Sequence, residues 1–155
     1  MRIEMKKWSM ILLVAWVVAS IGSSLMHSNP PVTHTVQWDS PKTKELFSKV
    51  CADCHSNETK WPWYSYIAPV SFVINYHVQE GREHFNVSNN ILKEAHEAAE
   101  EYEEGKMPES GYLQFHPEAQ LSSEDREALI TGLKATFGTK SPKNQEKPKE
   151  EGHHE

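Results

Sequence analysis

The sequence predicts an all-α protein, with about four helices in one small domain and a separate apolar helix before it. Between residues 40 and 138, apolar residues recur at three- and four-residue spacing in segments bounded by helix-capping residues. No segment alternates apolar and polar residues for long enough to indicate a strand. The expected divisions are an N-terminal segment at 1–27, a linker at 28–39, a folded domain at 40–138 and a charged tail at 139–155.

The N-terminal segment is typical of a membrane anchor. Arg2, Lys6 and Lys7 precede 18 uncharged residues from Trp8 to Leu25. At about 1.5 Å per residue, such a helix approaches the thickness of a bilayer core. Basic residues before a span stay in the cytoplasm, so we expect the domain on the periplasmic side of a bacterial inner membrane. Cleavage near residues 20–24, which would release a soluble periplasmic protein, stays open.

The first helix of the domain has clear boundaries. Pro30 and Pro31 favour an extended linker before it. Ser40 suits the N-cap position and Pro41 suits the first helical position. An apolar stripe then runs through Leu46, Phe47 and Val50 into Cys51. We therefore expect a helix of about ten residues that ends at this cysteine.

The segment Cys51-Ala52-Asp53-Cys54-His55 holds the chain's only two cysteines. C-x-x-C-H is the attachment motif of c-type haem. Two thiols at this spacing can bond to the vinyl groups along one porphyrin edge, and the histidine can ligate the iron. The motif predicts covalent haem c on Cys51 and Cys54, with His55 as proximal iron ligand. A redox dithiol and half of a zinc site remain as alternatives.

A cluster of aromatic residues follows the motif. Trp61, Trp63, Tyr64 and Tyr66 lie around Pro62, which disfavours a helix there. Such a loop could wrap a flat apolar ligand, and Trp61, Trp63 and Tyr64 are candidates for a haem pocket. Ordinary aromatic core packing is the alternative.

Three further helices are expected after this loop. The second of the domain spans about 68–80, with an apolar face of Val70, Val73, Ile74 and His77, and Gly81 as its stop. The third spans about 90–104 and ends at Gly105. The fourth begins at Ser122 or Ser123 and ends at Gly138, with acidic residues in its first turn. The tail alternates Lys, Glu and Pro without periodicity, which predicts disorder.

Charge restricts the partners of the domain. Residues 28–155 carry 13 Lys and Arg against 21 Asp and Glu, a formal net charge of −8. Such a domain will not bind nucleic acid through its phosphates. A domain this small is also marginally stable on its own, and a buried haem would add apolar surface for the helices to pack on.

The order of these elements resembles the small cytochrome c fold, in which the first and last helices cross beside the haem. The Gly105-Lys106-Met107-Pro108 turn is similar to the one that carries the sixth iron ligand in that family. Over about residues 36–137 the chain also resembles the bacterial haem-binding domain family of cytochrome c type. That likeness rests on the motif with the aromatic segment after it, Ile67-Ala-Pro-Val-Ser71, His77-Val-Gln-Glu-Gly-Arg82, Gly105–Pro108 and His116-Pro-Glu-Ala119.

The resemblance implies Met107 as the distal iron ligand. A thioether is a soft ligand that raises the potential of haem iron. His77, on an apolar helix face, is the main alternative, and His84 and His116 are weaker ones. The alternative for Met107 is a methionine that packs in the core or lies in a surface turn, and for His77 it is a histidine that packs in the core or contacts a haem propionate. Glu83 and Pro117 indicate that His84 and His116 lie in loops near solvent.

Two functions are compatible with such a site. The first is single-electron transfer with an unidentified redox partner protein, in which case the protein is not an enzyme. The second is a haem-based gas or redox sensor, or a peroxide-reactive haem protein, with an open or labile sixth position. The second would use a distal acid–base residue such as His77 or His84.

Overall fold

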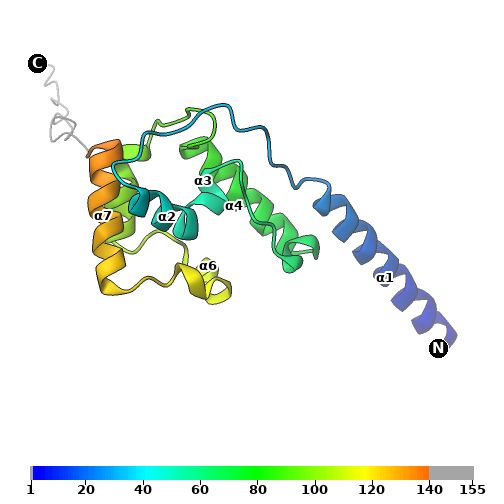
Figure 1. Cartoon of the computed structure of the whole chain (residues 1–155). Coiled ribbons are helices and arrows are strands. Elements are labelled where there is room, and N and C mark those ends of the chain that lie inside the picture. Colours follow the sequence, from blue (N-terminus) through cyan, green and yellow to red (C-terminus); the bar gives the residue numbers. More distant parts are fainter. Residues whose placement is uncertain (1, 140–155) are drawn as a thin grey trace, which may run out of the picture.

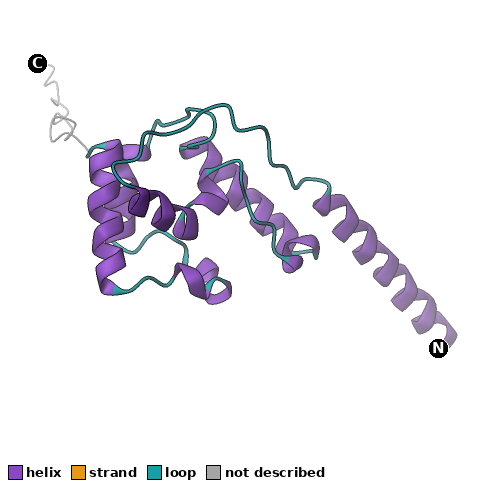
Figure 2. Ribbon diagram, viewed as in Figure 1, coloured by secondary structure: helices purple, strands orange, loops and turns teal. Residues whose placement is uncertain are grey.

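The computed structural model describes residues 2–139, so most of the predicted disordered tail lies outside the described residues. Every regular element in that range is helical, which confirms the all-α fold class (Figures 1 and 2). The α-helices are α1 (Arg2–Ser24), α2 (Pro41–Val50), α3 (Ala52–His55), α4 (Val70–His84), α5 (Ala98–Glu103), α6 (Ser110–Phe115) and α7 (Ser123–Phe137). Short 3-10 turns are η1 (Trp63–Tyr66), η2 (Ala95–Glu97) and η3 (Pro117–Ala119).

Helices α2 and α7 have the predicted boundaries. The Ser40 hydroxyl accepts a hydrogen bond from the Thr43 amide at 3.1 Å and caps α2. The Ser122 hydroxyl accepts one from the Asp125 amide at 3.1 Å and caps α7. Gly138 follows α7 with a φ of +81°, the left-handed region that favours glycine.

The two capped helices pack against each other at one end of the domain (Figure 1). A Cβ built on Gly132 of α7 would lie 1.9 Å from the Thr43 hydroxyl of α2, so only glycine fits at this crossing. The apolar core lies around the crossing and includes α5 and the turns beside it. Its members are Leu46, Phe47, Val50, Phe85, Ala95, Ala99, Tyr102, Ala119, Leu129 and Leu133.

Helix α4 differs from its prediction in length and orientation. It continues through Gly81 to His84, so Gly81 is not a helix stop. A Cβ on Gly81 would lie 2.8 Å from the Cys54 carbonyl oxygen, and glycine is needed because the two backbones approach so closely. The predicted apolar face is also not the buried one, since Val70 and Val73 are exposed. The buried face consists of Ser71, Asn75, Val78, Gly81 and Arg82.

The predicted third helix is much shorter in the structure. Asn90 has a φ of +63°, and Ile91 forms an isolated antiparallel bridge with Asn86. Helical structure therefore begins only at η2 and α5. The predicted end of the third helix is confirmed, because Gly105 follows α5 with a φ of +74°. Helix α6 was not predicted.

Helix α1 is the one described helix long and apolar enough to cross a membrane, over Glu4–Ser24, and a signal sequence would have the same character. Figure 1 shows it leaving the domain beside the first turns of α4. The linker after it has no regular secondary structure but is held to the domain. The Asn29 side-chain amide donates to the Thr59 carbonyl at 2.9 Å, and the Thr33 amide donates to the Ser88 carbonyl at 2.8 Å.

Candidate cofactor site

The cysteine–histidine motif forms a single helical turn directly after α2. The Cys51 amide donates to the Phe47 carbonyl at 2.8 Å and so continues the hydrogen bonding of α2. The His55 amide donates to the Cys51 carbonyl at 2.9 Å and closes the turn of α3. Both cysteines are unpaired and half-buried. The turn therefore keeps two free thiols and an imidazole within one short segment.

His55 is held in one tautomer by the end of α4. Its side chain is 9% exposed, its Nδ1 lies 3.1 Å from the Phe85 carbonyl oxygen, and its ring stacks on the Phe85 ring at 4.0 Å. Because a carbonyl oxygen only accepts, Nδ1 carries the proton and Nε2 keeps a lone pair. Burial lowers the pKa of His55, which favours the neutral ring. This is the state of a metal-ligating histidine whose other nitrogen donates to a carbonyl.

A hydrogen-bond network holds the Phe85 carbonyl in place. The Val87 amide donates to the His55 carbonyl at 3.0 Å. The Asn57 amide donates to the Ser88 hydroxyl at 3.0 Å, and the Asn86 side-chain amide donates to the Asn57 side chain at 2.8 Å. Residues 85–88 therefore run along residues 55–57. The role of Phe85 could not be predicted from the sequence, because a backbone carbonyl can accept a hydrogen bond whatever the side chain is.

The surroundings of the two thiols bear on the redox-dithiol and zinc alternatives. Burial raises the pKa of both Cys51 and Cys54 to about 12. Reactive dithiols instead have lowered pKa values, because the thiolate is the nucleophile. Within residues 2–139 there is also no group of three or more His, Cys, Asp or Glu side chains that could hold a metal ion. Within the described residues, the motif therefore has neither the lowered thiol pKa of a reactive dithiol nor a further set of ligands around it, and covalent attachment to a porphyrin stays a prediction.

Arg82 connects the motif, α4 and the linker. Its guanidinium donates to the Ser56 and Ser28 carbonyls, each at 2.8 Å. It also donates to the Thr59 hydroxyl at 2.9 Å and the Asn29 side-chain oxygen at 3.2 Å. All four acceptors are neutral, and burial lowers the pKa of Arg82. A buried cation thus fixes the segment that follows His55.

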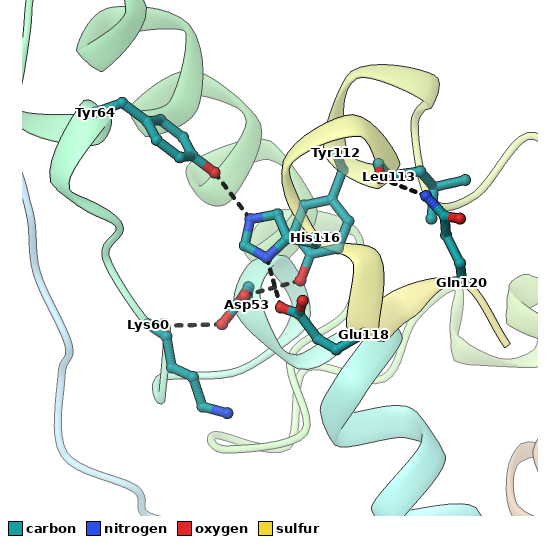
Figure 3. Close-up of polar contacts among 8 residues, drawn as sticks. All are labelled: Asp53, Lys60, Tyr64, Tyr112, Leu113, His116, Glu118 and Gln120. Carbon is teal, nitrogen blue, oxygen red and sulfur yellow. Dashed lines mark hydrogen bonds and ion pairs between the residues drawn. The ribbon is translucent and has the colours of Figure 1, made fainter.

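Asp53, between the two cysteines, connects the motif to α6 (Figure 3). One carboxylate oxygen accepts from the Tyr112 hydroxyl at 2.9 Å and the other accepts from the Lys60 amide at 2.9 Å. Burial, reinforced by the Asp53 charge, raises the pKa of Tyr112, so its hydroxyl stays a donor. Helix α6 is therefore attached to the motif through Asp53, a position that the C-x-x-C-H pattern leaves unspecified.

His116 makes a second attachment beside the first. Its Nε2 lies 3.0 Å from the Tyr64 hydroxyl, and its Nδ1 lies 3.0 Å from Glu118 (Figure 3). Its ring stacks on Tyr112 at 3.9 Å. Because both ring nitrogens already have partners, His116 has a structural place between η1 and α6.

The two principal candidates for the sixth ligand lie in segments that a polar contact connects. Met107 is 41% exposed, and its amide donates to the Glu101 carbonyl at 3.1 Å. The Nδ1 of His77 lies 2.9 Å from Glu109, two residues after Met107. Burial, followed by the charges of Asp53 and Glu109, raises the pKa of Cys54. The choice between Met107 and His77 stays a prediction.

The three aromatic residues expected in a haem pocket have other partners. Trp61 stacks on His27 at 4.1 Å, Trp63 is 75% exposed, and Tyr64 contacts His116. Their role in a pocket stays a prediction.

The α4 face that carries Gly81 offers an apolar surface next to Cys54. Val70, Val73 and His77 lie within one side of the helix by their spacing, and the two valines are exposed. A flat apolar cofactor attached to the motif would cover this face.

Comparison with known proteins gives one match. A family model described as a haem-binding domain matches residues 11–135, a range that contains the motif and every element from α2 to α6. No curated protein and no solved structure matches the chain.

Proposed function

The chain belongs to the haem-binding domain family, and from this membership we propose that it holds haem c covalently and transfers single electrons. The hydrogen bond from His55 Nδ1 to the Phe85 carbonyl carries the proposal. It leaves Nε2 as the unprotonated ring nitrogen, directly after two unpaired thiols. When bound, the haem supplies an iron that cycles between its ferrous and ferric states.

Each residue of the motif has one role in this proposal. Cys51 and Cys54 would hold the cofactor through two thioether bonds, each formed by adding a cysteine S–H across one porphyrin vinyl group. His55 binds the iron through Nε2, and the Phe85 carbonyl keeps its ring from turning. Arg82 and the 85–88 segment maintain this orientation through the bonds described above.

Met107 is the proposed distal ligand. Gly105 and the bond from the Met107 amide to the Glu101 carbonyl set the course of its loop. The contact between Asp53 and Tyr112 then attaches the following helix to the motif. An iron with two protein ligands has no open position for a substrate, which favours electron transfer over catalysis.

We further propose that α1 anchors the domain on the periplasmic side of the membrane. Its length and its apolar composition support an anchor, and basic residues precede its apolar run. The redox partner is then a protein in or on the same membrane.

The attachment proposal is tested by replacing the cysteines. Cys51→Ala and Cys54→Ala should each weaken covalent attachment, and the double variant should release all haem into acid–acetone. Full retention of haem by the double variant would contradict the proposal. His55→Ala should abolish the low-spin spectrum, whereas His34→Ala, which removes a linker histidine, should leave it unchanged.

The distal ligand is tested by absorption spectroscopy of the oxidised protein. Met107→Ala should abolish the long-wavelength methionine-to-iron charge-transfer band and lower the reduction potential. Met26→Ala, which alters an exposed methionine after α1, is the matched control. If the wild-type protein lacks the band, Met107 is not the ligand.

One observation favours the alternative of a gas sensor or peroxide-reactive protein. Glu109 pairs with Nδ1 of His77 at 2.9 Å, so Nε2 is the ring nitrogen that can face a ligand. An imidazole oriented in this way suits a distal acid–base group. Carbon monoxide binding to the reduced wild-type protein, lost or altered in His77→Ala, would support this function and exclude a stable Met107 ligand.

A further inference from the structure

A long uncharged segment lies between the motif and the end of α4. No Asp, Glu, Lys or Arg occurs between Lys60 and Glu80, in a chain in which 25% of residues are charged. The segment contains η1 and the first two and a half turns of α4. Its exposed large side chains are Trp63, Tyr66, Val70, Phe72, Val73 and Tyr76, and Tyr76 is 60% exposed. An exposed apolar surface of this kind marks contact with a partner or a membrane.

Helix α1 is attached to this segment at several levels. The Trp16 indole donates to the Ala68 carbonyl at 2.8 Å, and the Ala68 amide donates to the Ser20 hydroxyl at 3.1 Å. One turn later, the Ser23 hydroxyl donates to the Ser71 hydroxyl at 2.7 Å. The start of α4 therefore lies beside the last third of α1, as Figure 1 shows.

This attachment sets the depth of the segment in a membrane. Trp16 precedes the end of α1 at Ser24 by eight residues, about 12 Å along the helix axis. The candidate span of α1 reaches Ser24, and a bilayer core is about 30 Å thick. If α1 crosses the bilayer, Ala68 lies below the end of the span. The η1 turn, whose Tyr66 ring contacts His27 beyond Ser24, then lies at the outer interface.

The backbone of the segment is suited to such a place. Groups in lipid must have hydrogen-bond partners within the protein. The amides of Ser65, Ile67 and Ser71 donate to the Pro62, Tyr64 and Ile67 carbonyls at 2.9, 3.2 and 3.0 Å. Pro62 and Pro69 have no amide hydrogen to satisfy. Both backbone groups of Ala68 are bonded to α1, so the irregular turn before α4 is internally paired.

We propose that residues 63–76 form a membrane-facing segment that lies in the outer interface of the bilayer crossed by α1. Trp63, Tyr66, Phe72 and Tyr76 contact lipid, in keeping with the preference of Trp and Tyr for membrane interfaces. The partner is the lipid bilayer itself. The inference rests on the proposed anchoring role of α1, but not on the haem ligands or on electron transfer.

The lipid-contacting side chains Phe72 and Tyr76 are distinct from the surface proposed for the cofactor. Phe72 and Tyr76 lie four residues apart on one side of α4, away from the side of His77 and Gly81. Gly81 contacts Cys54 and lies five residues beyond Tyr76, about 8 Å along the helix. The motif is therefore held just above the lipid surface.

The proposal is tested by photocrosslinking in the full-length, haem-loaded protein. A benzophenone amino acid replaces Phe72, Leu13 or Thr131 in separate variants, which are reconstituted in phosphatidylcholine–phosphatidylglycerol vesicles with labelled phospholipid. Leu13 lies within α1, and Thr131 is exposed on α7. We expect phospholipid adducts at position 72 of the same order as at position 13, and none at position 131.

The three positions separate the ways in which the proposal can fail. Adducts at position 13 without adducts at position 72 would overturn the membrane-facing segment and leave the anchor intact. No adducts at either position would overturn the anchor and the segment with it. Haem absorption of each variant establishes that it is folded, since all three labels occupy exposed positions.

Discussion

The two sides of the domain are packed by different means. Around α2, α5 and α7 the interior is apolar, and Leu46, Phe47, Leu129 and Leu133 are at most 1% exposed. Around α3, α4 and the end of α1 the buried side chains are polar instead. They include Ser23, Ser56, Ser71, Asn75, Arg82 and Asn86. We call these the apolar side and the polar side.

The apolar side mainly stabilises the domain, whereas the polar side mainly fixes where its residues lie. Apolar burial stabilises in proportion to area and has no preferred direction. Hydrogen bonds are directional, so a buried polar network fixes where its members lie. The imidazole of His55 is oriented from the polar side, and α2, which leads into the motif, is held by the apolar side. Four sets of substitutions test this division.

The largest loss of stability is expected on the apolar side. Leu129→Ala removes a side chain with no exposed surface and should lower the free energy of unfolding by about 2–5 kcal/mol. Thr131→Ala, at an exposed position on the same helix, should change it by less than about 0.5 kcal/mol. Urea unfolding in detergent, followed by circular dichroism, measures both. Equal losses would mean that α7 is not part of a close-packed core.

The next largest loss is expected at Arg82. Arg82→Met leaves buried acceptors without their donor and should cost about 3 kcal/mol, since bonds to charged groups are worth about 1.5–3 kcal/mol. Arg126→Met is the matched control, because Arg126 donates to the Tyr102 and Glu103 carbonyls at the edge of the domain. Its loss should be smaller. If Arg82→Met and Arg126→Met lower the free energy of unfolding equally, the buried hydrogen bonds of Arg82 stabilise the domain no more than those of an arginine at its edge.

Alanine substitutions at Gly132 and Gly81 should differ in whether a second substitution can restore the lost stability. Gly132→Ala and Gly81→Ala each force a contact closer than 3.0 Å, which should cost about 1–3 kcal/mol. Thr43→Ala removes the two nearest atoms at Gly132 and should recover part of that loss. At Gly81 the nearest atom is the Cys54 carbonyl oxygen, which no side-chain substitution removes. Gly81→Ala should also lower the yield of attached haem, and an unchanged yield would contradict the close approach of α4 to the motif.

The smallest effect is expected at the cap of α7. Ser122→Ala removes the acceptor for the Asp125 amide and should cost about 1 kcal/mol. Ser123→Ala alters the neighbouring exposed serine and should be close to neutral. Because the cap belongs to the apolar side, neither change should alter the haem spectrum. A spectral change in Ser122→Ala would show that the two sides are coupled.

The apolar side was predictable and the polar side was not. Ser40 and Ser122 are local N-cap signals, and each precedes an apolar stripe, so the boundaries of α2 and α7 followed from the sequence. Along α4 the apolar stripe of Val70 and Val73 is exposed, while the buried face is formed by Ser71, Asn75 and Arg82. Hydrophobic periodicity cannot reveal a face that packs through hydrogen bonds. Gly81 was misread for a similar reason, because a close approach between helices leaves no local sequence signal.

The candidate site likewise has a part that the sequence predicts and a part that it does not. Cys51, Cys54 and His55 form a contiguous motif with its own chemistry, so they could be identified directly. Their supports are distant in sequence: the Phe85 carbonyl is 30 residues from His55, and Tyr112 is 59 residues from Asp53. Short α6, which carries Tyr112, has neither a side-chain N-cap bond nor a buried residue. Such contacts depend on tertiary structure and could not be predicted from spacing.

The attached linker limits how the domain can move relative to α1. A flexible chain of the length of residues 28–39 would let its ends separate by about 20 Å on average, enough for a tethered domain to search the space above its anchor. Here Asn29 and Thr33 are bonded to the domain, and Arg82 holds the Ser28 carbonyl. The linker is therefore held against the domain and does not act as a flexible tether. If α1 is the membrane anchor proposed above, an encounter with the proposed redox partner would come from two-dimensional diffusion of whole molecules rather than from movement of a tethered domain.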